Sequence, residues 1–231
     1  MEQIAIILQA RTGSTRLPNK VMRLLGGVPL LSHCIGRLQR IGTVIVATSD
    51  LTKDDPVEEL ARLKNVYCSR GSEEDVLDRY YHAAKMFNIR YIVRATGDNP
   101  FVDPNEAHRV VNYIVSNKVD YVTGAEVIDR LGLPVGVGVE AFTFNALERS
   151  WFEGHAKNHR EHVNEYILEN PGSFNIVRLK CLQESSCPGL RLTVDTDDDF
   201  NFVEEILKSI KKPAVEISTR EIIEWWQKRK N

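Results

Sequence analysis

Short apolar runs alternate with segments of helical periodicity along most of the chain, and this alternation narrows the choice of fold more than any other property of the sequence. The first run, residues 4–8, is apolar at every position, as in a strand that is buried on both faces of a parallel sheet. Between such runs, apolar residues recur every three to four positions, which is typical of helices that cover a sheet. The sequence therefore predicts an α/β fold with a mostly parallel central sheet and helices on both faces.

Turn and capping residues set the limits of the predicted elements. The predicted strands cover residues 4–8, 44–48, 66–68, 89–95, 119–123, 135–144, 174–182, 190–194 and 215–217. Helices are predicted to start at Pro29, at Asp54 or Asp55 with Pro56, after Ser72 with Asp75 completing a capping box, at Asp103 with Pro104, and at Ser218 with Glu221. Further helices are predicted at 144–152, 158–169 and 197–211.

The regular alternation of apolar runs and helical segments is interrupted between residues 124 and 185. A turn at 129–132 and a glycine-interrupted run at 135–144 indicate antiparallel or bulged structure there. No long Gly/Ser linker, internal repeat or low-complexity tract separates this stretch from the rest of the chain. We therefore predict a single domain over residues 1–231 with an inserted flap at 124–185.

The charge balance excludes two classes of partner. The chain has 30 Lys and Arg residues against 32 Asp and Glu, a net charge of −2. Duplex nucleic acid and an anionic membrane surface need a clustered basic field, so neither is an expected partner. No apolar run approaches the roughly 20 residues of a membrane span. The four cysteines form no CxxC pair, which favours reduced thiols over a disulfide or zinc framework and indicates a cytoplasmic protein.

The loop at residues 9–20 follows the first predicted strand and is rich in groups that bind phosphate. It contains three cations, Arg11, Arg16 and Lys20, together with small hydroxylated residues and a glycine, and it contains no acid. Ligands bind at the carboxyl ends of the strands in open α/β sheets, where backbone N–H groups, hydroxyls and cations together suit a triphosphate. A solvated surface loop is the alternative interpretation. The order of residues around Lys20 does not fit a Walker P-loop.

Two acidic residues follow other predicted strands. Asp98 lies in a turn after residues 89–95, and Asp195 directly follows residues 190–194. Acids at strand ends can hold a Mg²⁺ ion that bridges phosphates, and two of them facing one basic loop would form a metal–triphosphate site. The alternatives are an ordinary β-turn around Gly97 and Asp98, and acids that stabilise the start of the helix at 197–211.

Five segments carry a resemblance to a known family: residues 7–20 (ILQARTGSTRLPNK), 71–80 (GSEEDVLDRY), 96–100 (TGDNP), 160–163 (REHV) and 192–199 (LTVDTDDD). In this order they resemble the cytidylyltransferases of bacterial cell-surface sugars, and in particular the SpsF-like proteins of spore-coat polysaccharide biosynthesis. The CMP-3-deoxy-manno-octulosonate and CMP-acylneuraminate synthetases are related to these. The resemblance implies a nucleotide-diphospho-sugar transferase-like α/β sandwich, often a homodimer held partly by the flap.

The resemblance also implies which residues hold the substrates. Those along the cytosine and ribose of CTP would be Gln9, Ala10, Arg11, Thr12, Gly13 and Ser14. Those bordering the nucleotide pocket would be Ser69, Arg70, Gly71, Arg94 and Gly97. Arg16 and Lys20 would bind the triphosphate, and Asp98 and Asp195 would hold Mg²⁺, so that Arg16, Lys20 and Asp98 form the catalytic set. Most relatives have Gly where Asn19 stands here, and Asn accepts the left-handed backbone conformation better than most residues.

The expected reaction is Mg²⁺-dependent transfer of a cytidylyl group from CTP to an anionic sugar or sugar-like acceptor, with release of pyrophosphate, in surface polysaccharide or glycoconjugate biosynthesis. In such an in-line displacement the protein positions the reactants and neutralises charge. Two alternatives stay open: a glycosyltransferase that uses a nucleotide-sugar, and a nucleotide-binding subunit without activity. The sequence leaves open whether the acceptor is a sugar acid, a sugar phosphate or another phosphate or phosphonate.

Overall fold

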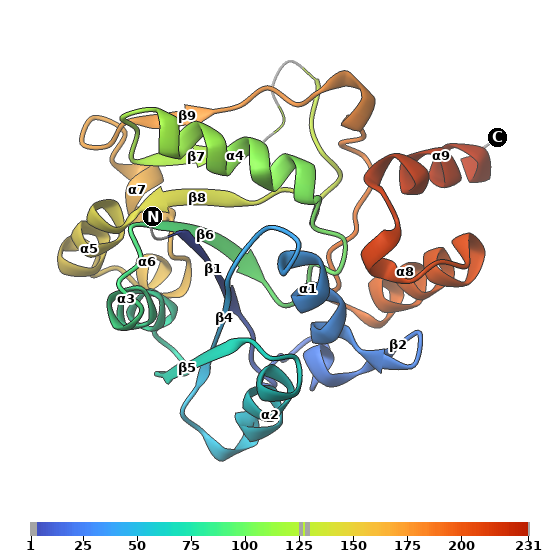
Figure 1. Ribbon diagram of the computed structural model, residues 1–231, viewed down its shortest axis with the longest axis horizontal. Helices are drawn as coiled ribbons and strands as arrows, with labels where there is room; N and C mark the ends of the chain where they lie inside the picture. The colour runs from blue at the N-terminus through green and yellow to red at the C-terminus, as the bar shows by residue number, and fades with distance from the viewer. Residues whose placement is uncertain (1–3, 125–126, 128–129, 231) are drawn as a thin grey trace.

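A computed structural model describes residues 4–124, 127 and 130–230, and its centre is a seven-stranded sheet (Figure 1). The strands are β1 (Ile4–Gln9), β4 (Val44–Ser49), β5 (Tyr67–Gly71), β6 (Tyr91–Thr96), β7 (Tyr121–Thr123), β8 (Glu140–Thr143) and β9 (Ile176–Arg178). Their order across the sheet is β5-β4-β1-β6-β8-β7-β9. β8 pairs antiparallel with both of its neighbours, and the other neighbouring pairs are parallel. The predicted mostly parallel α/β sheet is therefore confirmed.

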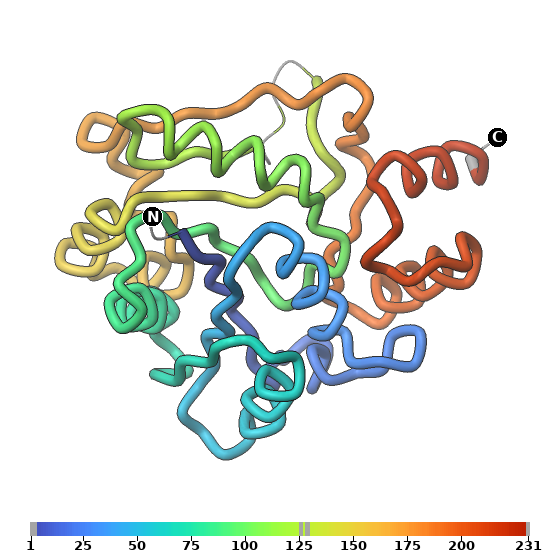
Figure 2. The backbone as a smooth tube through the Cα atoms, viewed as in Figure 1, coloured from blue at the N-terminus to red at the C-terminus, as the bar shows by residue number. Residues whose placement is uncertain are grey.

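Helices cover both faces of this sheet (Figure 1). One face carries α1 (Leu30–Leu38), α2 (Asp55–Leu63) and α4 (Pro104–Ser116). The opposite face carries α3 (Val76–Met86), α5 (Phe144–Glu153), α6 (Lys157–Glu161) and α7 (Glu165–Glu169). The last two helices, α8 (Asp197–Ile210) and α9 (Thr219–Lys230), pack on each other beside the sheet (Figure 2). They adjoin a small hairpin of β2 (Leu24–Leu25) and β3 (Val28–Pro29).

The alternation of side chains along β1 explains why both faces are covered. Ile6 and Leu8 belong to the apolar cluster under α1, α2 and α4, whereas Ala5 and Ile7 belong to the cluster under α3 and α5. Successive side chains of a strand face opposite sides of the sheet, so an entirely apolar strand needs a layer of helices on each side. Burial of each large aliphatic side chain contributes roughly 2 kcal/mol to folding.

Capping residues set the helix starts, with one difference from the prediction. Ser218 and Glu221 exchange hydrogen bonds at the start of α9, as predicted. At the start of α3 the capping carboxylate is that of Asp75, which accepts a hydrogen bond from the N–H of Asp78 at 2.9 Å. Ser72 instead accepts a hydrogen bond from the N–H of Asp75. The predicted cap at Ser72 was therefore wrong, because the chain makes one more turn before the helix begins.

Two predicted strands are absent from the described part of the chain. Residues 190–194 make only an isolated parallel bridge, between Val135 and Arg191, and residues 215–217 overlap a 3₁₀ turn, Ala214–Glu216. Both segments are apolar because they pack in a third cluster with α8 and α9 instead of in the sheet. Apolar composition alone does not distinguish these two environments.

Three further predictions differ in detail. The helix expected at 158–169 is split into α6 and α7, because the chain leaves helical geometry at His162 and turns Val163 into the core. The strand expected at 135–144 is regular only in β8, since Gly136 has a φ of 92°. The turn expected at 129–132 begins at Asp129, which lies outside the described residues.

The segment 124–185 takes part in the central sheet. It supplies β8, which lies between β6 and β7, and β9, which is an edge strand. Its helix α5 packs against α3. The segment therefore contributes to the main core, and its part in a dimer stays a prediction.

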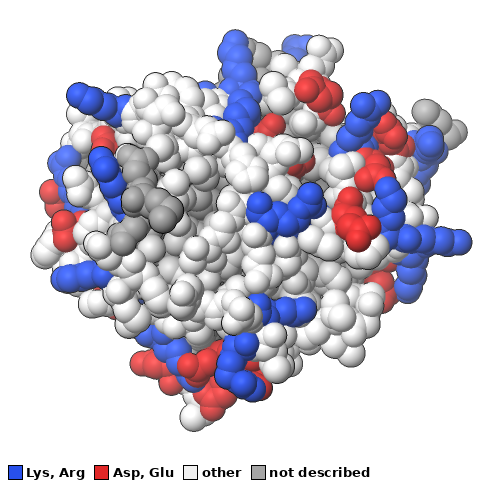
Figure 3. Space-filling model, viewed as in Figure 1, with Lys and Arg blue, Asp and Glu red and all other residues white. Residues whose placement is uncertain are grey.

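The surface carries charges of both signs. Figure 3 shows Lys and Arg side chains next to Asp and Glu side chains around the rim of one face. In the ranges 4–124 and 130–230, no helix is long and apolar enough to cross a membrane. All four cysteines are free thiols, two of them buried and two partly buried.

Candidate active site

A cavity of about 410 Å³ lies beyond the carboxyl ends of β1 and β6. The predicted site residues in its wall are Gln9, Ala10, Arg11, Gly13, Ser14, Arg16, Lys20, Gly97, Asp98 and Asp195. The loops after the two strands are closely packed, since the N–H of Gly97 donates to the carbonyl oxygen of Gln9 at 2.9 Å. A Cβ atom at Gly97 would lie only 3.1 Å from that of Ala10. Glycine at this position therefore lets the acidic turn approach the basic loop.

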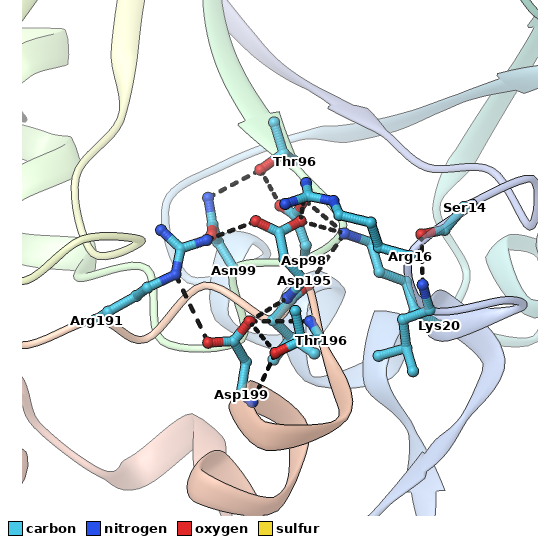
Figure 4. Close-up of polar contacts among 12 residues, drawn as sticks. Ser14, Arg16, Lys20, Thr96, Asp98, Asn99, Arg191, Asp195, Thr196 and Asp199 are labelled. Carbon is cyan, nitrogen blue, oxygen red and sulfur yellow. Dashed lines mark hydrogen bonds and ion pairs between the residues drawn. The ribbon is translucent and has the colours of Figure 1, made fainter.

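Lys20 joins the two acidic segments (Figure 4). Its Nζ donates to Asp98 Oδ2, to Asp195 Oδ1 and to the carbonyl oxygen of Val194, each at 3.0 Å. The turn that directs this side chain inward starts at Asn19, which has a φ of 56°. Asn adopts this left-handed conformation more readily than other residues except Gly. The basic loop and both acids therefore meet at one nitrogen atom.

Two guanidinium groups also contact Asp195 (Figure 4). Arg16 Nη2 lies 3.0 Å from Asp195 Oδ1, and Arg191 Nη2 lies 2.5 Å from Asp195 Oδ2. Arg191 reaches further, to Asp199, at 3.6 Å. Asp195 is thus neutralised by more than one cation. Sequence analysis missed Arg191 because it lies in a run that was expected to be a strand.

A chain of hydrogen bonds fixes Asp98. The hydroxyl of Thr96 donates to Asp98 Oδ1, and Asn99 Nδ2 donates to the Thr96 hydroxyl at 2.8 Å. Asp98 Oδ2 is thereby left for Lys20. The side-chain oxygen of Asn99 is buried and has no hydrogen-bond partner among the residues described.

The start of α8 holds the backbone of Asp195 in place. The carboxylate of Asp199 accepts hydrogen bonds from the N–H groups of Asp195 and Thr196, at 3.0 and 2.9 Å. Burial raises the pKa of Asp199, but these hydrogen bonds outweigh burial and hold the pKa below its ordinary value. The capping interpretation thus applies to Asp199, while the side chain of Asp195, ahead of the cap, lines the cavity.

The basic loop is anchored by Asp54, for which the sequence predicted only a place at the start of a helix. Asp54 is fully buried. Its Oδ1 accepts hydrogen bonds from the N–H and the hydroxyl of Thr12, at 2.7 and 2.6 Å, and its Oδ2 accepts one from the Ser49 hydroxyl. Burial raises the pKa of Asp54, but the hydrogen bonds from Ser49 and Thr12 outweigh it, so that the pKa lies below 3.8. Thr12, for which a nucleotide contact was expected, therefore fastens the loop to the end of β4.

A second acid faces the same loop. Glu73 Oε1 lies 2.6 Å from Lys53 Nζ and 3.0 Å from Arg11 Nη1. The hydrogen bond from Lys53, more than that from Arg11, holds the pKa of Glu73 below its ordinary value. A Cβ atom at Gly13 would lie 2.5 Å from the same carboxylate oxygen. A larger residue at this position would require the Glu73 carboxylate to shift from its place between Lys53 and Arg11.

Three residues expected at the border of the nucleotide pocket lie elsewhere. Ser69, Arg70 and Gly71 end β5 and are absent from the described wall of the cavity. Arg70 Nη1 lies 2.8 Å from Asp55 and 2.6 Å from Glu58. Because β5 is an edge strand, this guanidinium group reaches α2 instead of the cavity.

Arg94 lines a second cavity, of about 230 Å³, which adjoins the first at Thr96. Its Nη1 lies 3.0 Å from Glu140 Oε2. Burial lowers the pKa of Arg94, but the charge and hydrogen bond of Glu140, together with the nearby Tyr80 and Tyr121, outweigh burial and raise the pKa above its ordinary value. Arg94 is therefore held in a buried ion pair beside the main cavity.

Helices α3 and α6 complete the wall of the main cavity. α3 supplies Val76 and Arg79, α6 supplies Glu161, and His162 directly follows α6. Arg160 fixes α6 there, because its Nε and Nη2 donate to Asp75 Oδ2 at 2.7 and 2.5 Å. In the REHV segment, Arg160 therefore has a structural role, while Glu161 and His162 line the cavity. The motif alone did not indicate these different roles.

The donor set of the cavity fits a divalent cation bound together with phosphates. Within the described ranges, no group of three or more His, Cys, Asp and Glu side chains is arranged to hold a metal ion. Mg²⁺, however, is commonly held by only one or two carboxylates, with water and substrate phosphates as its other ligands. Asp98 and Asp195 match that requirement, and Arg16 and Lys20 supply positive charge beside them. Such a site can bind a nucleoside triphosphate and stabilise a leaving pyrophosphate.

Comparison with known proteins identifies the family. The family model described as Cytidylyltransferase matches residues 5–223. The chain belongs to the cytidylyltransferase family. Two relatives of the chain are the uncharacterized protein MJ1063 of Methanocaldococcus jannaschii and the spore coat polysaccharide biosynthesis protein SpsF of Bacillus subtilis. MJ1063 is 39% identical, with 96% of this chain and 89% of the relative covered. SpsF is 33% identical, with 94% and 92% covered, so the resemblance found in the sequence is confirmed.

Solved structures show that the chain has a nucleotidyltransferase fold. A cytidylyltransferase from Leptospira borgpetersenii aligns with a TM-score of 0.89 at 30% identity, covering 99% of this chain and 95% of that one. CMP:2-keto-3-deoxy-manno-octonic acid synthetase complexed with CTP aligns with a TM-score of 0.68 at 19% identity, covering 90% and 100%. Rv0371c from Mycobacterium tuberculosis, solved with manganese, aligns with a TM-score of 0.60 at 17% identity, covering 88% and 98%.

Proposed function

We propose that this chain transfers a cytidylyl group from CTP to an anionic sugar or sugar-like acceptor and releases pyrophosphate, in surface polysaccharide or glycoconjugate biosynthesis. The observation that carries the proposal is the convergence of Lys20, Asp98 and Asp195 in a cavity lined by the basic loop. Membership of the cytidylyltransferase family supports CTP as the nucleotide. A protein of the same fold was crystallised with CTP, which also supports this choice.

In this proposal Arg16 and Lys20 stabilise the leaving group. The acceptor oxygen, either already anionic or losing its hydroxyl proton to water, forms a bond to the α-phosphorus of CTP while the bond to the bridging oxygen breaks, and pyrophosphate leaves with that electron pair. Negative charge grows on the pyrophosphate as the bond breaks, so cations already held nearby lower the barrier. Arg16 and Lys20 occupy the same cavity, and both already contact Asp195.

Asp98 and Asp195 are the residues that would hold Mg²⁺. When bound, the metal neutralises phosphate charge and polarises the phosphoryl group under attack. The protein keeps both carboxylates oriented: Thr96 donates to Asp98, and Asp199 holds the backbone N–H of Asp195. A manganese complex of a protein with the same fold supports a divalent metal in this reaction.

The second cavity is where we place the acceptor. It is lined by Arg94, Asn99 and Thr193, and it shares Thr96 with the nucleotide cavity. The side-chain oxygen of Asn99 and the Nε of Arg94 are buried and have no hydrogen-bond partner among the described residues. Buried polar atoms of this kind are normally satisfied, and a sugar hydroxyl and an anionic oxygen of the acceptor would satisfy them.

Pyrophosphate release tests the proposal. The purified protein is incubated with CTP, Mg²⁺ and a panel of sugar acids, sugar phosphates and phosphonates, and at least one acceptor should give CTP-dependent pyrophosphate. Consumption of a nucleotide-sugar without pyrophosphate release would identify a glycosyltransferase instead. Binding of CTP without turnover on any acceptor would favour a non-catalytic subunit. Either result would overturn the proposal.

We further propose that the protein is a cytoplasmic homodimer whose interface includes part of segment 124–185. The support is the resemblance to the SpsF-like proteins. Light scattering should give a mass twice that of the 26.3 kDa chain. A monomer in solution at working concentrations would contradict the dimer.

A further inference from the structure

The position between the two proposed metal ligands is filled by the chain's own ammonium group. An ammonium has three N–H donors, and those of Lys20 find three acceptors at 3.0 Å: Asp98, Asp195 and the Val194 carbonyl. The side chains of Lys20, Asp98 and Asp195 are 11%, 23% and 14% exposed. Little water therefore competes for these contacts, and the two carboxylates are neutralised without any ligand.

A divalent cation must compete with this ammonium for the same oxygen atoms. Mg²⁺ needs the carboxylate oxygens that Lys20 already uses, and repulsion between two cations is strong where solvent screening is weak. Arg16 and Arg191 add positive charge at Asp195, at 3.0 and 2.5 Å. In the nucleotide-free protein these surroundings disfavour a metal ion.

A triphosphate changes this competition, because it brings phosphate oxygens into the same cavity. Lys20 and Arg16 line that cavity together with the basic loop. The lysine head is a compact charge on a flexible four-carbon stem, so it can exchange one set of oxygen acceptors for another. Once the ammonium binds phosphate, the oxygens of Asp98 and Asp195 become available.

We infer that Lys20 is a resident counter-ion that keeps the metal position closed in the free protein until a nucleoside triphosphate draws its ammonium group away. The inference rests on the proposed function and adds an order of binding to it. The metal enters with the nucleotide or after it. Lys20 is therefore a positioning residue for the two carboxylates as well as a phosphate ligand.

Binding of Mn²⁺ to the nucleotide-free protein tests this, with the electron paramagnetic resonance signal of free Mn²⁺ as the readout. The wild type should bind Mn²⁺ weakly at this position. Lys20→Met keeps the apolar stem and removes the charge, so its affinity for Mn²⁺ should rise by about tenfold or more, equivalent to about 1.4 kcal/mol. Adding Asp98→Asn to Lys20→Met should abolish the gain, because one ligand is then lost.

Lys53→Met is the matched control. It removes a cation from the same end of the sheet, but the ammonium group of Lys53 pairs with Glu73 at 2.6 Å. Its Mn²⁺ affinity without nucleotide should equal that of the wild type. An equal gain in Lys53→Met and Lys20→Met would attribute the effect to overall charge and overturn the inference.

Two other outcomes would also overturn it: no gain in Lys20→Met, or a gain that persists when Asp98→Asn is added. If Lys20→Met does not fold, Lys20→Gln takes its place. Mn²⁺ binding to the wild type with and without CTP also tests the inference without any variant. Mn²⁺ binding to the free wild type as tight as in the presence of saturating CTP would show that the position is open. These titrations involve no turnover, so they can fail while pyrophosphate release succeeds, and the reverse also holds.

Discussion

The backbone N–H of Val194 donates to the carbonyl oxygen of Asp98 at 2.9 Å. This bond ties the turn after β6 to the segment that leads into α8, and it places Asp195, the next residue, beside Asp98. Lys20 then closes the arrangement through the side chains of both acids and the carbonyl oxygen of Val194. Residues far apart in the sequence thus form one preorganised unit, as electrostatic stabilisation of a leaving group requires.

Lys20→Ala should weaken the binding of CTP more than that of CMP. We assign its charge to the β- and γ-phosphates, which CMP lacks. Loss of a cation from a partly buried phosphate site costs about 2 kcal/mol, or roughly thirtyfold in affinity. Calorimetric titration of both nucleotides with Mg²⁺ measures the difference. Equal losses for CTP and CMP would place Lys20 away from the outer phosphates.

Asp54→Ala should destabilise the protein and loosen the basic loop. The substitution leaves the N–H and hydroxyl of Thr12 and the hydroxyl of Ser49 without their acceptor. Unsatisfied buried groups of this kind cost about 2 kcal/mol, measured as the change in the free energy of unfolding in urea. Asp55→Ala is the control, because Asp55 is 59% exposed and pairs only at the surface with Arg70. A similar loss in both variants would show that the anchor is unimportant.

The stability contributed by Asp54 should depend on pH. Its pKa in the folded protein lies below the ordinary value of 3.8, so the unfolded chain binds more protons than the folded one in this range. The contribution is therefore complete above the ordinary pKa and is lost as the pH falls through the lowered folded value. Urea unfolding of the wild type and of Asp54→Asn at a series of acidic pH values measures it. The variant should lose less stability on acidification, and parallel losses would contradict the assignment.

The nucleotide cavity should select a pyrimidine base. Its wall at Gln9 and Ala10 is held against Gly97 by a 2.9 Å hydrogen bond and close packing, and we expect the base to lie along this wall, where a purine would need more room. CTP with Mg²⁺ at about a hundredfold excess over its Kd should stabilise the protein by about 2.7 kcal/mol and raise its melting temperature. ATP and GTP should raise it less at the same concentration. Equal shifts for all nucleoside triphosphates would refute base selection.

The location of the site was predictable because strand ends are predictable. Lys20, Asp98 and Asp195 follow strands or runs that end at the same edge, where open α/β sheets bind ligands. Their residue types then indicated a metal and a triphosphate. Even the mistaken strand at 190–194 led to the expectation that Asp195 lies near Asp98, and it does, because Val194 donates a hydrogen bond to the carbonyl oxygen of Asp98 in the turn after β6.

The partners that hold these residues were not predictable in the same way. Asp54 lies two residues before Pro56 and has the pattern of a helix-capping residue, and nothing in the sequence connects it to Thr12. Arg191 lies in an apolar run that packs under α8 and α9, which a one-dimensional pattern cannot distinguish from a strand. Arg70 has the residue type of a phosphate ligand, yet the edge position of β5 directs it to Asp55 and Glu58. The positions of the Asp54, Arg191 and Arg70 side chains all depend on contacts between segments that are distant in the sequence.

Asp98 and Asp195 should act as ligands of one metal ion. Asp→Asn keeps the size of the side chain and one oxygen but removes the charge that holds a hard cation. Each single variant should therefore stay folded and lose pyrophosphate release by a factor on the order of a hundred. Because both carboxylates serve one ion, the double variant should lose little more than either single one.

Two neighbouring acids provide the control. Asp197 and Asp198 lie in the first turn of α8, where Asp197 pairs with Arg23 at the surface and is 69% exposed. Their replacement by Asn removes a favourable charge from the helix start, worth at most about 1 kcal/mol of stability, and should leave turnover nearly intact. Pyrophosphate release across a Mg²⁺ titration compares all five variants. If Asp98→Asn or Asp195→Asn turns over like the wild type, or if their losses multiply in the double variant, the two residues do not share a metal ion.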